Sequence, residues 1–111
     1  MNLETPYSFV DPMEAHVERA AQLMGMLSNP SRLRILCLLA EEEHSVGHLA
    51  KRLGMPQPSM SQQLKKLRAA GLVKSRRDAQ TIYYGLNGVE VTEVLATLHR
   101  LYCQETALAQ E

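Results

Sequence analysis

The chain has 111 residues, of which 45% are hydrophobic, so it is long enough for one core and too short for two domains of ordinary size. Its longest apolar run, Ile35 to Ala40, is far below the roughly 20 residues that span a membrane, and two cysteines do not suggest a secreted disulfide framework. The formal net charge is zero, which by itself argues against a nucleic-acid partner. The first residues carry acids and prolines instead of a basic and then an apolar segment, so we expect a cytoplasmic protein with no membrane partner.

The N-terminal part predicts two helices. The first runs from Asp11 or Pro12 to Leu27, and Ser28, Asn29 and Pro30 end it. Its apolar stripe at helical spacing consists of Met13, Val17, Ala20, Met24 and Leu27. The second helix begins at Pro30 or Ser31 and runs into acidic residues 41–43. The apolar side chains on one of its faces are Leu33, Leu36, Cys37 and Ala40.

Two further helices are separated by a short turn. Ser45 is suited to cap a helix from Val46 to Leu53, which Gly54 ends. Pro58 suits the first turn of a fourth helix, which runs to Ala70 with Gly71 as its C-terminal cap. The inner stripe of this fourth helix consists of Met60, Leu64 and Leu67. Its opposite face is polar and basic.

The C-terminal part predicts a β-hairpin and a last helix. Residues 72–75 and 81–86 have the β-branched and aromatic content of two strands, separated by residues 77–80. The last helix begins near Val89, and its apolar side carries Val91, Val94, Leu95, Leu98 and Tyr102. We therefore expect a mainly α fold with a β-hairpin wing, in the order α-α-α-α-β-β-α. It occupies residues 13–104, between tails at 1–12 and 105–111.

The third and fourth helices have the pattern of a helix-turn-helix, in which the second helix enters the major groove of DNA. Eight lysines and arginines face one aspartate between Ser45 and Tyr84, whereas acids outnumber bases on both sides of this segment. The side chains expected to read bases are Gln57, Ser59, Ser61 and Gln62. Those expected to hold phosphates are Lys65, Lys66 and Arg68, and those of the wing are Arg76, Arg77 and Gln80. A solvated basic face of a helical domain is the alternative for either feature alone, and their combination favours double-stranded DNA.

Residues 29–86 resemble the ArsR/SmtB family of winged-helix repressors, and the resemblance extends from Ala15 to Cys103. The matching parts are Asn29-Pro30 with residues 32–36, the helix at residues 59–67, and Gly71-Leu72-Val73. The resemblance implies a homodimer that uses the first and last helices, and therefore a pseudo-palindromic operator. The apolar stripes of these two helices agree with such an interface. Its expected residues are Val17, Met24, Val94, Leu98 and Leu101.

The signal that controls such a repressor has to be sought in the residues of this chain. Metal-sensing members carry cysteines in the third helix or acids and histidines in the last one. Here the third helix has no cysteine, and Glu90, Glu93 and His99 lack the paired spacing of a metal site. We expect no metal and no cofactor, and a metal-responsive repressor remains an alternative. His48, like His16 and His44, is expected to be an ordinary residue.

Cys37 and Cys103 are the chemically distinctive residues. Their placement in the second and last helices resembles the sulfide-responsive subgroup of the BigR and SqrR type, to which HlyU-like virulence regulators are similar. The resemblance implies a dithiol that reacts with persulfide or polysulfide and releases the operator when it is bridged. An HlyU-like anti-silencing role is a second alternative.

The residues alone leave the reactivity of the two cysteines open. Cys37 equally fits a small core side chain. For Cys103, His99 and Arg100 one turn away favour a thiolate, whereas the helix C-terminus opposes it, so the order of attack is not fixed. A thiol enzyme using Cys103 and His99 would need oxyanion donors, a glycine-rich loop or a second acid, and none is arranged there, so we expect no enzyme.

Overall fold

The computed structural model of the protein describes residues 10–104. Its elements are α1 (Val10–Glu14), α2 (Val17–Leu27), α3 (Pro30–Glu41), β1 (His44–Ser45), α4 (Val46–Leu53), α5 (Gln57–Ala69), β2 (Val73–Asp78), β3 (Thr81–Leu86), α6 (Val89–His99) and a π-helical turn, η1 (Arg100–Gln104). The predicted winged helix-turn-helix order is confirmed. No helix in this described part is long and apolar enough to cross a bilayer.

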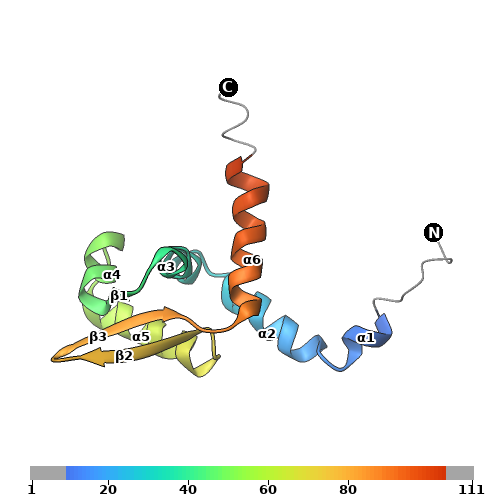
Figure 1. Ribbon diagram of the computed structural model, residues 1–111, viewed down its shortest axis with the longest axis horizontal. Coiled ribbons are helices and arrows are strands. Elements are labelled where there is room, and N and C mark those ends of the chain that lie inside the picture. The colour runs from blue at the N-terminus through green and yellow to red at the C-terminus, as the bar shows by residue number, and fades with distance from the viewer. Residues whose placement is uncertain (1–9, 105–111) are drawn as a thin grey trace.

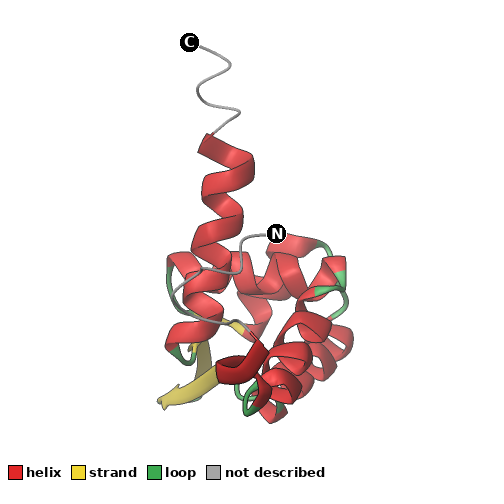
Figure 2. Cartoon of the chain, turned by 90° about the vertical axis from the view of Figure 1, so that its right-hand side faces the viewer, coloured by secondary structure: helices red, strands yellow, loops and turns green. Residues whose placement is uncertain are grey.

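One hydrophobic core joins α3, α4, α5, the base of the hairpin and the start of α6. Its fully buried side chains are Ile35, Leu36, Leu49, Met60, Leu64, Leu67, Val73 and Val91. Each such aliphatic side chain stabilises the fold by about 1.5–3 kcal/mol relative to an exposed position. Figure 2 shows the strand pair at the edge of this helical body, with α6 rising away from it.

The helix-turn-helix is formed by local interactions that the sequence specifies. The Ser45 Oγ accepts a hydrogen bond from the His48 backbone N–H at 3.1 Å and so caps α4, as predicted. Gly54 ends α4 with a φ of 66°, a left-handed conformation that glycine adopts without a steric penalty. Helix α5 follows after Pro56, and the buried stripe of Met60, Leu64 and Leu67 fixes which of its faces points outward.

The wing belongs to a three-stranded sheet in the order β1-β3-β2. The two-residue strand β1, which the sequence did not predict, pairs with β3 through His44 opposite Tyr84 and Ser45 opposite Tyr83. Strands β2 and β3 extend further than expected and leave Ala79 and Gln80 as the turn. Ala79 adopts a φ of 58°, a conformation that is unfavourable for a residue with a Cβ atom.

The predicted first helix is interrupted. The chain turns at Ala15 and His16, where the His16 backbone N–H donates to the Met13 carbonyl at 2.7 Å, so α1 and α2 are separate helices. The side chains from Asp11 to Arg19 are exposed, so no packing within the single chain holds the segment in one continuous helix.

The predicted inner face of the second helix is also wrong. Its buried side chains are Ile35, Leu36 and Leu39, whereas Cys37 and Ala40 are exposed. The run from Ile35 to Ala40 is apolar on every side, so periodicity alone does not identify the buried face. The structure therefore does not support Cys37 as a core side chain.

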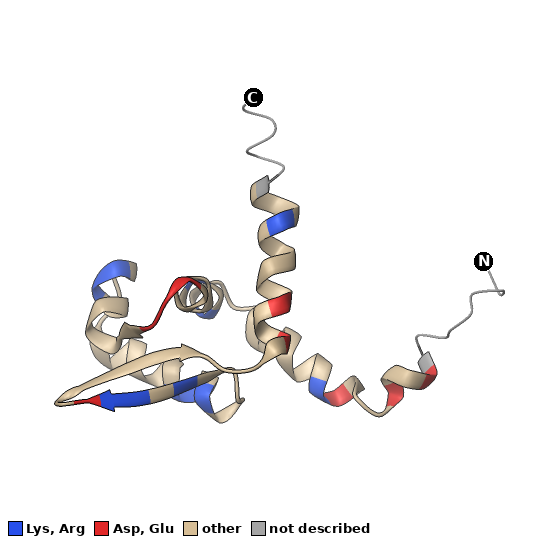
Figure 3. Ribbon diagram, in the orientation of Figure 1, with Lys and Arg blue, Asp and Glu red and all other residues tan. Residues whose placement is uncertain are grey.

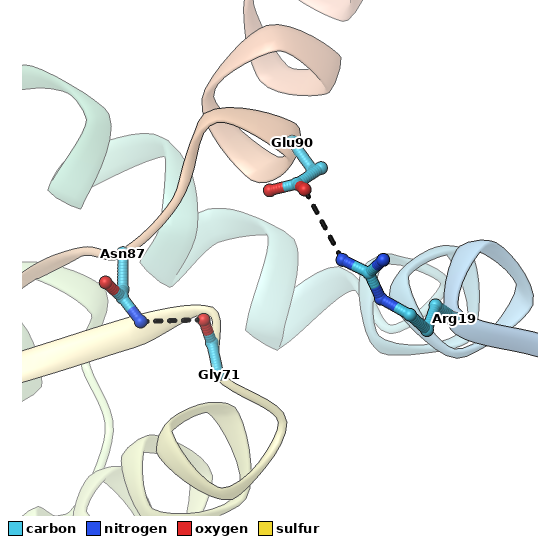
Figure 4. A network of polar contacts seen from close by, with 4 residues as sticks. All are labelled: Arg19, Gly71, Asn87 and Glu90. Atoms are coloured by element: carbon cyan, nitrogen blue, oxygen red, sulfur yellow. Dashed lines mark hydrogen bonds and ion pairs between the residues drawn. The ribbon is translucent and has the colours of Figure 1, made fainter. Parts of the chain in front are cut away.

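The terminal helices project from the body in different directions, as Figure 1 shows. Their bases are held by polar contacts (Figure 4): Arg19 Nη2 lies 3.5 Å from Glu90 Oε2, and Asn87 Nδ2 donates to the Gly71 carbonyl at 3.1 Å. Both helices leave apolar side chains in contact with solvent, including Met24 at 58% and Leu101 at 54% exposure. Large exposed apolar side chains on two projecting helices are typical of a surface that a partner covers.

Candidate DNA-binding surface and cysteine pair

Helix α5 presents the side chains predicted to read DNA. Because Met60, Leu64 and Leu67 face the core at 0% exposure, the polar side chains of this helix point to solvent. All the predicted contacts on it are exposed, namely Gln57, Ser59, Ser61, Gln62, Lys65, Lys66 and Arg68. Gln57 lies closest to the preceding helix, with Oε1 4.0 Å from where a Cβ on Gly47 would be. The exposed helix with a polar N-terminal end and basic C-terminal end matches the geometry of a recognition helix.

The basic side chains gather on one part of the molecule. Figure 3 shows most lysines and arginines on α4, α5 and β2, whereas most acids lie on α1, α2, α6 and the connection after α3. This arrangement adds Lys51 and Arg52, exposed in the last turn of α4, to the basic surface. The sequence analysis counted them in the basic segment but did not assign them a contact with DNA.

The two wing arginines have different environments. Since β2 pairs in register with β3, Arg76 lies opposite Tyr83 and Arg77 opposite Ile82, on opposite faces of the hairpin. Arg76 Nε donates to Glu43 Oε1 at 2.7 Å, and its guanidinium lies 4.8 Å from the centre of the Tyr83 ring. The hydrogen bond to Glu43 and its charge raise the pKa of Arg76. Arg77 and Gln80 are exposed, and Arg77 makes no ion pair with any residue in the described range 10–104.

Cys37 and Cys103 are both free and exposed. Partial burial raises the pKa of the Cys37 thiol, and the negative charges that Cys103 and Glu41 can carry raise it further. The contribution of Cys103 means that the two thiols lie within electrostatic range of each other, across the junction of α3 and η1. Cys37 also borders an open, mainly apolar groove of about 420 Å³ through which a small sulfur donor can approach.

The histidines are less uniform than the sequence suggested. His48 is exposed, as expected, but its ring stacks on that of His44 with centroids 4.7 Å apart. His44 is half-buried, and within the described residues its Nε2 is buried without a hydrogen-bond partner. The described part of the chain contains no group of three or more histidine, cysteine or acidic side chains able to hold a metal ion.

Comparisons with known proteins agree with this geometry. Residues 29–75 match the family model described as "Bacterial regulatory protein, arsR family". The transcriptional activator HlyU from Vibrio cholerae is 46% identical over 92 residues, which cover 83% of this chain and 85% of that protein. One HlyU structure covers 82% of this chain and 99% of its own with a TM-score of 0.78, and another, described as reduced HlyU, has the same score.

Two other solved structures have the same fold. The transcriptional repressor BigR from Xylella fastidiosa is 36% identical, with a TM-score of 0.79 over 86% of this chain and 98% of its own. A homodimeric winged helix-turn-helix DNA-binding domain from Mycobacterium bovis, Mb0332, is 30% identical, with a TM-score of 0.75 over 92% of this chain and 93% of its own.

Proposed function

Since this chain belongs to the ArsR family of bacterial regulatory proteins, and is therefore a transcription regulator, we propose that its regulation is by reactive sulfur species. In this proposal a homodimer binds a pseudo-palindromic operator as a repressor, and it releases the operator when persulfide or polysulfide bridges Cys37 and Cys103. The observation that carries the proposal is the proximity of the two exposed thiols on α3 and η1.

The dimer is supported by the apolar side chains that the single chain leaves uncovered. Val17 and Met24 on α2 and Leu101 on η1 are exposed, while Val94 and Leu98 on α6 are half-buried. The Mb0332 domain, which has the same fold, is described as homodimeric. A two-fold axis between the terminal helices places two copies of α5 for two half-sites of one operator.

The bridging reaction balances without a further oxidant. One cysteine thiolate attacks the sulfane sulfur of a persulfide RSSH, which forms Cys–S–SH and releases the thiolate RS⁻. The second thiolate attacks the inner sulfur of that adduct, which forms Cys–S–S–Cys and releases HS⁻. A longer adduct, Cys–S–S–SH from a polysulfide, leaves an extra sulfur in the bridge. The two thiols are oxidised, and the sulfane sulfur is reduced to sulfide.

A bridge between α3 and η1 links the core of the DNA-binding body to the C-terminal part that is expected to dimerise. Such a link changes the relative stability of arrangements that place the two recognition helices differently. A tenfold loss of DNA affinity requires a bias of only about 1.4 kcal/mol.

The direct test measures operator affinity by fluorescence anisotropy before and after treatment with glutathione persulfide, with intact mass measured in parallel. We expect the treated protein to lose at least tenfold in affinity and to carry an intrasubunit Cys37 to Cys103 bridge. C37S and C103S are each expected to bind DNA and to ignore the persulfide. Unchanged affinity of fully bridged protein refutes the mechanism, and a response of the double serine variant places the sensor elsewhere.

Two alternatives are separated by further measurements. The 46% identity to a protein described as an activator favours an activating or anti-silencing role as the second candidate, and a transcription assay on the isolated promoter decides between the two directions. A zinc titration of the reduced protein, followed by DNA affinity, tests metal control.

A further inference from the structure

The connection after α3 joins the helix that carries Cys37 to both DNA-reading elements. Helix α3 ends at Glu41, and β1 begins at His44 and pairs with β3 of the wing. The next residue in the chain, Ser45, both pairs with Tyr83 of the wing and caps α4 of the helix-turn-helix. A displacement of α3 therefore reaches the wing and α4 through very few residues.

Glu43 is the side chain that fastens this connection to the wing. Its Oε1 accepts the 2.7 Å hydrogen bond from Arg76 Nε on β2. Its Cγ lies 3.2 Å from where a Cβ on Gly85 would be, so the carboxylate stem rests directly on β3. A glycine at this position leaves room for the close approach. Glu43 thus contacts both strands of the hairpin.

Tyr83 completes the arrangement. It is the register partner of Ser45 on β1 and of Arg76 on β2, and its ring lies beneath the Arg76 guanidinium at 4.8 Å. Glu43, Arg76 and Tyr83 therefore form one cluster, here termed the wing clamp, with one member from the α3 connection and one from each wing strand. A charged hydrogen bond and a cation–π contact on the same guanidinium restrict its position more than either contact alone.

We propose that Glu43 is a positioning residue that couples the cysteine pair to the wing. Cys37 lies little more than one helical turn before the end of α3, so a bridge that shifts this helix moves Glu43, and the wing clamp carries the shift to Arg76. This inference rests on the proposed function, because the bridge supplies the displacement. It adds the route by which the wing responds.

The test compares E43Q with E42Q, which removes the same charge one residue away. The Glu42 carboxylate makes no ion pair with any residue from 10 to 104, so E42Q is the matched control. Each variant is measured reduced and after glutathione persulfide treatment, for bridge formation by mass and for operator affinity. A second variant, R76Q, removes the other member of the ion pair, and the ratio of reduced to bridged affinity cancels its own loss of DNA contact.

We expect E43Q to form the bridge as the wild type does, yet to lose at least fivefold less affinity on bridging. R76Q is expected to show the same reduced ratio, and E42Q the ratio of the wild type. Hydrogen exchange of the β2 peptide is expected to change on bridging in the wild type and E42Q but not in E43Q. This readout does not follow from a merely structural effect on stability.

Wild-type coupling in E43Q, or an equal loss of coupling in E42Q, overturns the inference. Failure of the wild type to bridge, or to lose affinity when bridged, contradicts the proposed function instead. Mass and affinity of the wild type therefore distinguish the two failures.

Discussion

The roles assigned to neighbouring residues of α5 lead to a quantitative difference between two alanine variants. Gln62 and Lys65 are exposed one helical turn apart, so neither substitution removes core packing, and each is expected to change stability by no more than about 0.5 kcal/mol. Lys65 is expected to bind a phosphate, and each phosphate contact contributes about 0.9 to the slope of log affinity against log salt.

In a dimer K65A removes two such contacts, which lowers the slope by about 1.8. Between 50 and 200 mM salt the wild type should therefore lose about twelvefold more affinity than K65A, on any DNA sequence. Q62A should leave the slope unchanged and should reduce discrimination between operator and scrambled DNA by about 1–3 kcal/mol per base contact.

Anisotropy titrations with operator and scrambled duplexes at several salt concentrations measure both quantities. R34A is the control, because Arg34 is an exposed cation on α3, outside the basic surface of α4, α5 and β2. If K65A kept the wild-type slope, or if Q62A weakened both duplexes equally, the assignment of α5 to the major groove would be wrong.

Three other substitutions test the dimer, the cysteine and the core. L98D places a carboxylate on half-buried α6 surface, where an unpaired buried charge costs several kcal/mol, so sedimentation should show a monomer, and an intact dimer at micromolar concentration would contradict the interface. Because the pKa of Cys37 is raised, iodoacetamide should alkylate C103S protein more slowly than free cysteine near neutral pH, with a half-maximal rate at higher pH; faster labelling than free cysteine would refute this. L64A removes a side chain with 0% exposure and should lower the free energy of unfolding by about 2–5 kcal/mol in urea, and a loss under 1 kcal/mol would argue against the core described here.

The sequence predicted elements well where short-range chemistry determines them. Ser45 and Gly54 bound α4 because a hydroxyl cap and a left-handed glycine act within a few residues. The stripe of α5 was identifiable because its apolar residues are separated by polar ones. In α3 the same reasoning failed, since every residue from Ile35 to Ala40 is apolar and the buried face is chosen by packing against other elements.

Features that depend on distant pairs were not predictable. Strand β1 has only two residues, and it exists because Tyr83 and Tyr84 of β3 lie beside it. The ion pair of Glu43 and Arg76 joins residues 33 positions apart, and in the sequence Glu43 is one of three successive glutamates with nothing to distinguish it. The break at Ala15 and His16 reflects missing packing partners, which a pattern of spacing does not reveal.

The zero net charge of this chain is compatible with DNA binding because the two kinds of surface are separated in space. Lysines and arginines gather on α4, α5 and β2, whereas the uncovered apolar side chains lie on α2 and η1. A dimer formed through the terminal helices would cover the apolar side chains and leave both basic surfaces free for one duplex. Cys37 and Cys103 lie on α3 and η1, where the DNA-binding body meets the C-terminal part, and outside the basic surface. Chemistry at these thiols therefore leaves the DNA contacts themselves intact and acts through the placement of the elements that carry them.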